Sequence, residues 1–277
     1  MVKPVVSVVI PTYKRPRELV RALRSVLAQE YAELEILVVD DNISGGEHRR
    51  LTEAALEGLD SRIIHIRNEI SLGGAGARNV GIQAARGVFV AFLDDDDEWL
   101  PGKLSAQLSL FRTLPLEYCS VDTGFFEIDE RRNSKRTILP ALRGDIFEEL
   151  LVKHKGRAPK LSSMLCRTAA LREVGLFDAS LPSRQDLDLY LRLARQYLFD
   201  YIAEPLVNKY IHASGRISSV SSNKIRGFEL VYIKYRSDLD SRPALHRKYL
   251  RKHAFWLAKG GKYMQALEKF LKSLVVR

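Results

Sequence analysis

Residues 89–104 read FVAFLDDDDEWLPGKL, an apolar run that leads directly into four consecutive aspartates. The run Phe89–Leu93 is short, apolar and followed by polar residues, as expected of a buried strand. Asp94–Asp97 could form a solvated turn ahead of a helix that opens near Pro101, because Asp favours turns and helix N-caps. Adjacent carboxylates beside a hydrophobic core nevertheless destabilise a protein unless a cation lies among them. The stretch therefore predicts a strand that delivers an acidic functional site.

Short apolar runs alternate with segments of helical periodicity over the first 120 residues. Strict alternation of strand and helix predicts parallel strands joined by right-handed crossovers, which is a doubly wound α/β sheet. The expected strands are Val5–Ile10, Glu35–Val39, Arg62–Arg67 and Gly87–Leu93, and the expected helices are Arg17–Gln29, Glu47–Gly58 and Ala75–Ala85.

A polar cluster follows each of these four strands. In doubly wound sheets, ligands bind beyond the carboxyl ends of the strands. All four clusters should therefore lie at one edge of the sheet and form one ligand site. The clusters are Pro11–Arg15, Asp40–Asn42, Asn68 with Gly73–Asn79, and Asp94–Asp97.

The rest of the chain is less regular, and its long connections predict a mixed, mainly parallel central sheet. We expect strands at Leu116–Ile128, Leu161–Arg167 and Tyr201–Ile211, and helices at Asp145–His154, Asp186–Arg195, 224–237, 244–258 and 262–274. This pattern divides the chain into a domain at 1–222, with a nucleotide-binding half at 1–120 and an acceptor-binding half at 121–222, and a helical extension at 223–277.

Composition limits the class of protein and its compartment. The 277 residues are 46% hydrophobic, enough for a large core, and the two cysteines suggest neither a disulfide framework nor a metal site. The apolar runs are too short for a secretory signal or a membrane span, so we expect a cytoplasmic protein. Residues 224–277 hold 14 Lys and Arg against 4 Asp and Glu, so the net charge of +10 lies in the extension.

The glycine-rich segment 71–81, SLGGAGARNVG, resembles a dinucleotide-binding fingerprint only superficially. That fingerprint follows the first strand, whereas this segment follows the third. Two interpretations stay open. The glycines allow a ligand to approach a helix N-terminus, with Arg78 directed toward a phosphate, or they serve close packing alone.

Three further features have both a functional and a structural interpretation. The ring of Tyr13 could stack on a base and Asp41 could accept from a base N–H, although both residue types are common at strand ends. The run Asp94–Asp97 does not fit the aspartate-rich prenyl-diphosphate site, which lies on long helices. It fits hard oxygen ligands for Mn²⁺ or Mg²⁺ beside substrate phosphates.

Four ordered segments together resemble glycosyltransferase family 2 over roughly residues 5–215: VSVVIPTYKRP, EILVVDDN, GGAGARNVGIQAARGVFVAFLDDDDEWLPGKL and GLFDASLPSRQDLDLYLRLA. The resemblance implies a Rossmann-like GT-A fold that binds nucleotide sugars. It also implies inverting, metal-dependent transfer from a nucleoside diphosphate sugar, most simply a UDP-sugar, to a hydroxyl of a glycan or lipid-linked acceptor. Surface polysaccharide or glycolipid synthesis would be the setting. The Q-x-x-R-W segment of processive synthases is absent from the sequence, so transfer of a single sugar is expected.

The resemblance also implies a role for individual residues. This chain has Gln185-Asp186 where the family usually has Glu-Asp, which removes a negative charge beside the expected base. The implied nucleotide-sugar ligands are Pro11, Thr12, Tyr13, Arg15 and Asp41 toward the base, Asp94 and Asp95 toward the ribose and Arg78 toward the diphosphate; Asp96 and His212 are the implied Mn²⁺ or Mg²⁺ ligands, and Asp186 is the general base.

The basic extension supports an alternative of another class, a catalytically silent nucleotide-binding protein that associates with membranes. A peripheral location at the inner face of the membrane would then follow. A basic helix with an apolar stripe suits an anionic membrane surface, but the same pattern suits a bundle that packs on the core. No nucleic-acid reader motif accompanies the charge, so nucleic acid is not expected as a partner. The stripe is Tyr249, Leu250, His253 and Leu257, flanked by Arg247, Lys248, Arg251 and Lys252.

Overall fold

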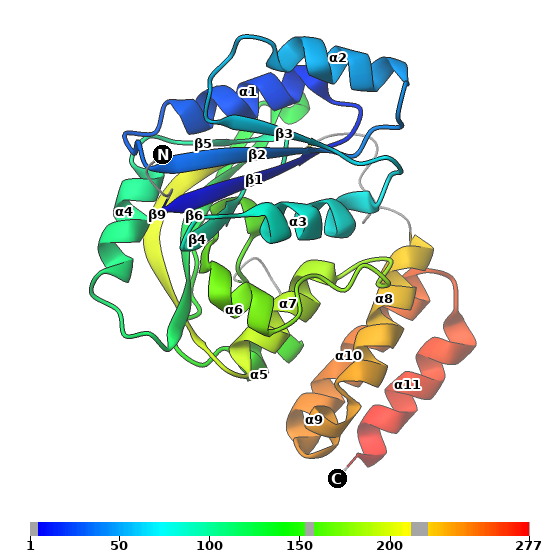
Figure 1. Cartoon of the computed structure of the whole chain (residues 1–277). Helices are drawn as coiled ribbons and strands as arrows, with labels where there is room; N and C mark the ends of the chain where they lie inside the picture. The colour runs from blue at the N-terminus through cyan, green and yellow to red at the C-terminus, as the bar shows by residue number, and fades with distance from the viewer. Residues whose placement is uncertain (1–4, 153–157, 212–220, 277) are drawn as a thin grey trace.

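The four N-terminal strands form one side of a nine-stranded sheet in the computed structural model, which describes residues 5–152, 158–211 and 221–276 (Figure 1). They are all parallel and lie in the order β3-β2-β1-β4, as the alternating pattern predicts. Every residue of β2 and β4 is buried, because helices cover both faces of this part of the sheet. The strands are β1 Val6–Thr12, β2 Leu34–Asp40, β3 Ile63–Arg67 and β4 Phe89–Phe92.

Three crossover helices connect these strands. In Figure 1, α1 and α2 lie on one face of the sheet and α3 lies on the other. The buried residues of α1 recur every three or four positions, which is the spacing of one helical face against a core. The bounds are α1 Pro16–Leu27, α2 Glu47–Leu56 and α3 Gly73–Ala84, close to the predicted ranges.

The second side of the sheet is mixed, as expected. Its order is β4-β8-β6-β9-β5, with β7 paired to β6; β6 and β9 are parallel, and the other pairs are antiparallel. Strands β5 and β7 were not predicted from the sequence. The bounds are β5 Asp97–Trp99, β6 Tyr118–Asp129, β7 Ser134–Ile138, β8 Leu165–Arg167 and β9 Leu198–Tyr210.

Two predicted boundaries in this half are wrong. Only Leu165–Arg167 of the expected strand at 161–167 is extended, and Leu161–Ser163 forms a 3-10 turn. Ser162 and Ser163 in this turn bond to buried carboxylates, which favours a turn over a strand. The helix expected from Pro101 begins at Lys103, because Gly102 adopts a left-handed φ of 81°. The helices are α4 Lys103–Phe111, α5 Phe147–Val152, α6 Thr168–Glu173, which was not predicted, and α7 Gln185–Ala194.

Four helices form a C-terminal bundle that packs on α7 through α8 and on α5 through α10 (Figure 1). The prediction that an apolar stripe of α10 faces a membrane is wrong, and the alternative of bundle packing holds. All four residues of the stripe are buried inside the molecule: Tyr249, Leu250, His253 and Leu257. Across the three described ranges, no helix is both long and apolar enough to cross a membrane. The bounds are α8 Ser221–Lys234, α9 Arg236–Asp240, α10 Pro243–Lys259 and α11 Tyr263–Val275.

Candidate functional site

The polar clusters at the ends of β1 to β4 meet at one edge of the sheet. Thr12 Oγ1, at the end of β1, donates to Asp95 Oδ2 at 2.9 Å, which joins the first and fourth clusters. The amide of Lys14 donates to Asn42 Oδ1 at 2.8 Å, which joins the first and second. These bonds form because parallel strands end at the same edge. The predicted convergence is therefore observed.

Asp41 is held by the loop that leads into α3. Its carboxylate accepts from Asn68 Nδ2, Ser71 Oγ and the amides of Leu72 and Gly73, all at 2.8–2.9 Å. Acceptance of amides at a helix N-terminus is favourable for a negative charge. The carboxylate thus fixes the glycine-rich segment, and its contact with a nucleotide base stays a prediction.

Arg49 organises the same edge and was missed in the sequence, because a basic residue in the middle of a helix gives no signal of its own. It is buried on α2, and its guanidinium donates to the carbonyl oxygens of Asp40, Asn42 and Asn68. One side chain therefore holds the loops that follow β2 and β3.

The glycine-rich segment combines both open interpretations. A Cβ added at Gly81 would lie 2.4 Å from Val9 Cγ1, so this glycine is required for packing of α3 on β1. A Cβ at Gly74 would instead lie 3.1 Å from Nη1 of Arg78. The segment therefore packs closely at its C-terminal part and gives room to a cation at its N-terminal part.

Tyr13 and Asp95 lie where the loop after β1 meets the acidic turn. Tyr13 is 41% exposed, so its ring is accessible to a planar ligand. Asp95 accepts from Thr12 and lies 3.1 Å from Nη1 of Arg15. Burial raises the pKa of Asp95 to about 7, which Arg15 partly opposes and the charge of Asp96 reinforces.

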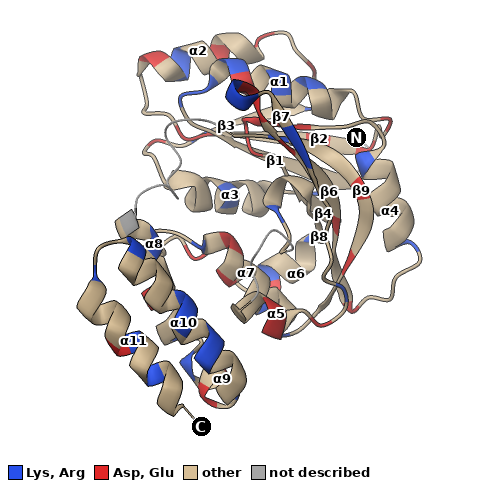
Figure 2. Ribbon diagram, turned by 180° about the vertical axis from the view of Figure 1, so that it is seen from behind, with Lys and Arg blue, Asp and Glu red and all other residues tan. Residues whose placement is uncertain are grey.

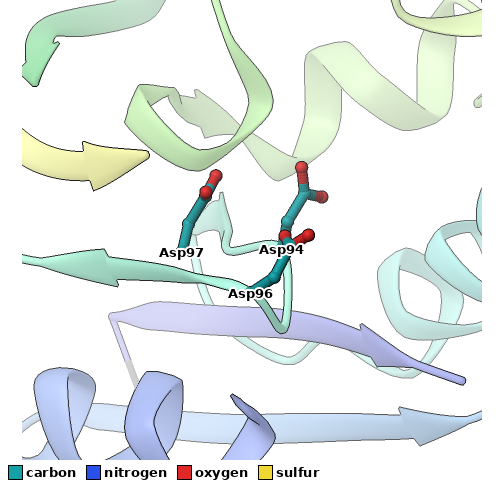
Figure 3. Close-up of side chains that lie close together, drawn as sticks. All are labelled: Asp94, Asp96 and Asp97. Carbon is teal, nitrogen blue, oxygen red and sulfur yellow. The ribbon is translucent and has the colours of Figure 1, made fainter. Parts of the chain in front are cut away.

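The other three aspartates form a cluster. Asp94, Asp96 and Asp97 each offer a carboxylate oxygen, and these oxygens lie within 4.8 Å of one another. Figure 3 shows the three side chains extending from the turn that joins β4 to β5. A set of carboxylate oxygens at this separation fits a divalent hard cation, so the residues present are compatible with Mn²⁺ or Mg²⁺.

A basic side chain lies against each member of this cluster. Arg78 contacts Asp94 at 2.5 Å, Arg15 contacts Asp96 at 2.6 Å, and Lys209 of β9 contacts Asp97 at 2.8 Å and Asp94 at 3.7 Å. Burial alone would raise the pKa of Asp94, but Arg78 and Lys209 lower it to about 2. Three positively charged side chains therefore lie at the site, where an anionic ligand could contact them.

Asp97 is the most strongly fixed of the three. It is fully buried and accepts from Ser162 Oγ at 2.6 Å and from the amide of Tyr210 at 3.3 Å, in addition to Lys209. The register of β5 on β9 places Asp97 opposite Lys209. Lys209 and Ser162 were not predicted, because they reach the site from segments distant in sequence.

Arg78 retains a donor for a ligand. Within residues 5–152, 158–211 and 221–276, no acceptor bonds its buried Nε, although the side chain is 15% exposed. An unpaired buried guanidinium N–H is costly unless a ligand completes it. This orphaned donor beside Asp94 fits the predicted contact with a phosphate.

The expected base, Asp186, lies in the first turn of α7. Asp186 is half-buried and occupies the second position of the helix, and Arg184 is the N-cap residue. Tyr190 follows one turn later on the same face. Its hydroxyl is buried and finds no partner in the described part of the chain, and burial, followed by the charge of Asp186, raises the pKa of Tyr190. The charges of Asp94 and Arg78 also act on the pKa of Tyr190, so this hydroxyl lies near both Asp186 and the acidic cluster.

The C-terminal bundle holds α7 in place through Asp188. This carboxylate is fully buried and pairs with Arg192 Nε at 2.9 Å, Lys234 Nζ at 2.8 Å and the hydroxyl of Tyr235 at 3.0 Å. Two of these three partners lie at or next to α8, so the extension is part of the support of the expected catalytic helix. His212, the expected second metal ligand, lies outside the described residues.

Comparisons with known proteins agree with this geometry. The family model "Glycosyl transferase family 2" matches residues 7–175, which include the strand-end clusters but end before Asp186. The chain is 28% identical over 239 residues to the Escherichia coli K12 protein named putative colanic acid biosynthesis glycosyl transferase WcaA, covering 86% of this chain and 83% of that one. It is 42% identical over 105 residues to the Escherichia coli enzyme named UDP-Glc:alpha-D-GlcNAc-diphosphoundecaprenol beta-1,3-glucosyltransferase WfgD, covering 38% of this chain and 40% of that protein.

Solved structures support the fold. The Staphylococcus aureus TarS 1–349 structure in complex with UDP-GlcNAc superposes with a TM-score of 0.70 at 18% identity and covers 98% of this chain and 81% of that one. A second TarS 1–349 structure gives a TM-score of 0.67 with the same coverage. The sheet, the acidic turn and the order of the motifs thus have one common explanation: the chain has the GT-A fold and belongs to glycosyltransferase family 2.

Proposed function

We propose that this glycosyltransferase transfers one sugar from a UDP-sugar, with inversion, to a hydroxyl of a lipid-linked diphosphate acceptor in surface polysaccharide synthesis. The observation that carries the proposal is the shared neighbourhood of Asp186, Tyr190 and the Asp94–Arg78 pair. This neighbourhood supports Asp186 as the base of a reaction at a diphosphate held near Arg78. Relatives whose names specify UDP-Glc and a diphosphoundecaprenol acceptor support the choice of donor and acceptor.

Asp186 acts on the acceptor. Its carboxylate takes the proton of the attacking hydroxyl while the oxygen forms a bond to C1 of the sugar, on the face opposite the leaving group. The bond from C1 to the diphosphate oxygen breaks in the same step and UDP leaves. General base assistance of this kind contributes roughly 10²–10⁴-fold to the rate.

Basic side chains act on the leaving group. Arg78 has an unsatisfied buried donor, and Arg15 and Lys209 lie on the same acidic cluster, so three cations surround the expected diphosphate position. Mn²⁺ or Mg²⁺ held by Asp96, with Asp94 beside it, would neutralise charge on the departing diphosphate. Asp97 is excluded from that role in our proposal, because Ser162 and Lys209 already hold it.

The nucleoside end of the donor lies on the other side of the cluster. The exposed ring of Tyr13 stacks on the base, Pro11 and Thr12 form the end of β1 beside it, and Asp41 accepts from a base N–H. Asp95 bonds the ribose. Because Asp95 lies between Thr12 and Arg15, this arrangement connects recognition of the ribose with the charge at the diphosphate.

Calorimetry of UDP binding with and without Mn²⁺ tests the assignment of the centre, and release of UDP from UDP-glucose or UDP-GlcNAc in the presence of a diphospholipid-linked GlcNAc tests the reaction. Asp96→Ala should abolish the Mn²⁺-dependent part of UDP binding. The matched control is Asp60→Ala, since Asp60 pairs with the nearby Arg62 away from the cluster. Equal UDP affinity with and without Mn²⁺ would contradict the metal assignment, and tight UDP binding without turnover of any donor would favour the silent binding protein.

A further inference from the structure

Helix α11 presents its apolar side to solvent. Six of its side chains are between 51% and 80% exposed, which is unusual for large apolar residues of a folded bundle. At 100° per residue they fall within an arc of about 120°. We define this α11 apolar face as Tyr263, Met264, Leu267, Leu271, Leu274 and Val275.

The opposite side of α11 makes the contact with the protein. Ala266 and Ser273 are its buried residues, and Ala266 packs against Leu257 of α10 and Ile225 of α8. A helix that served only bundle packing would turn its leucines inward and its small and polar residues outward. In α11 the large apolar side chains face outward and the small ones face the bundle, which indicates that this helix makes a contact outside the bundle.

The α11 apolar face lies at the outer boundary of the molecule. Figures 1 and 2 both show α11 as the outermost helix, with α10 between it and α7. Contiguous exposed apolar surfaces of this kind mark interaction sites in soluble and peripheral proteins.

Charge identifies the partner. Residues 224–277 carry 14 Lys and Arg against 4 Asp and Glu, and Figure 2 shows these basic positions along α8, α10 and α11. A second copy of the chain would bring this positive segment against itself, whereas anionic lipid headgroups would neutralise it. Helices with an apolar face and basic residues lie in the plane of such a membrane interface.

We propose that the α11 apolar face inserts into the headgroup region of an anionic lipid bilayer. The inference rests on the proposed lipid-linked acceptor for its biological use, since docking would bring the active site to a substrate in the same membrane. Its physical basis is independent of that acceptor. The face is different from the α10 stripe suggested by the sequence, whose apolar residues are buried.

Sedimentation with vesicles tests the proposal without any activity measurement. The full chain is mixed with vesicles of phosphatidylcholine containing 30% phosphatidylglycerol, and with pure phosphatidylcholine, at low and high salt. The chain should bind the anionic vesicles at low salt, and Leu267→Glu with Leu271→Glu should weaken binding by about tenfold or more. The control is Val88→Glu with Leu116→Glu, which makes the same charge change at exposed leucine and valine positions of the sheet domain and should leave binding unchanged.

Two results would overturn the proposal. One is wild-type binding to anionic vesicles that the α11 double variant retains, with both proteins equally folded by circular dichroism. The other is absence of wild-type vesicle binding; if the wild type is then a dimer by light scattering and the α11 double variant is a monomer, the face contacts a second copy. Loss of vesicle binding with unchanged UDP affinity separates a failure of membrane docking from a failure of the proposed nucleotide site.

Discussion

Replacing Asp188 by alanine should lower the free energy of unfolding by about 3–5 kcal/mol, the cost of breaking a buried ion pair by removal of one partner. Asp188 is fully buried and accepts from Arg192, Lys234 and Tyr235, so its loss removes the carboxylate that these three donors share. The change also removes the link between α7 and α8. Turnover should therefore fall together with stability, because Asp186 lies two residues earlier on the same helix.

Urea unfolding followed by circular dichroism measures the effect. Asp178→Ala is a matched control, since Asp178 also accepts from Lys234, at 3.0 Å, but its side chain is 29% exposed. Exposed pairs contribute up to about 1 kcal/mol, so the control should change little. A loss below about 1 kcal/mol for Asp188→Ala would contradict the role of this carboxylate as a buried link between the bundle and the expected catalytic helix.

Two further changes probe the bundle and the sheet. His253 is buried on α10, and burial, assisted by Lys269, lowers its pKa to about 4. Because the folded pKa of His253 is depressed, stability that is present above the unfolded pKa of about 6.5 is lost as pH falls toward 4. Between pH 7 and 4.5 the free energy of unfolding of His253→Leu, measured with urea, should therefore fall by about 1–3 kcal/mol less than that of wild type. An unchanged pH profile would contradict a neutral buried imidazole. Gly81→Ala places a Cβ 2.4 Å from Val9 Cγ1 and should lower the unfolding free energy by about 1–3 kcal/mol. A thermal melting temperature equal to wild type would show that α3 can move away from β1 at no cost.

The parallel side of the sheet could be predicted because its strands are short and mainly apolar, and β1, β2 and β4 are buried almost throughout. The strand-end rule then placed the polar clusters at one edge without any knowledge of contacts. The short β5, Asp97–Trp99, could not be predicted in this way. Its residues are DEW, and its extended form depends on pairing with β9, more than a hundred residues later.

The acidic residues of the site and the basic residues Arg15 and Arg78 beside them could be predicted, but the partners of Asp97 could not. The run Asp94–Asp97 is visible in the sequence, whereas Lys209 and Ser162 reach it from β9 and from a 3-10 turn. The apolar stripe of α10 could be predicted as buried, but its partner could not, because periodicity does not show what a helix face packs against. On α10 the cover is the bundle itself.

We propose that Asp186, on α7, removes the acceptor proton beside the Asp94–Arg78 centre. Steady-state UDP release by Asp186→Asn, compared with wild type at matched UDP affinity, tests it most directly. Turnover by Asp186→Asn should fall by roughly 10²–10⁴-fold, with the dissociation constant for UDP within a few-fold of wild type. Turnover at the wild-type rate would contradict the role of Asp186 as the base.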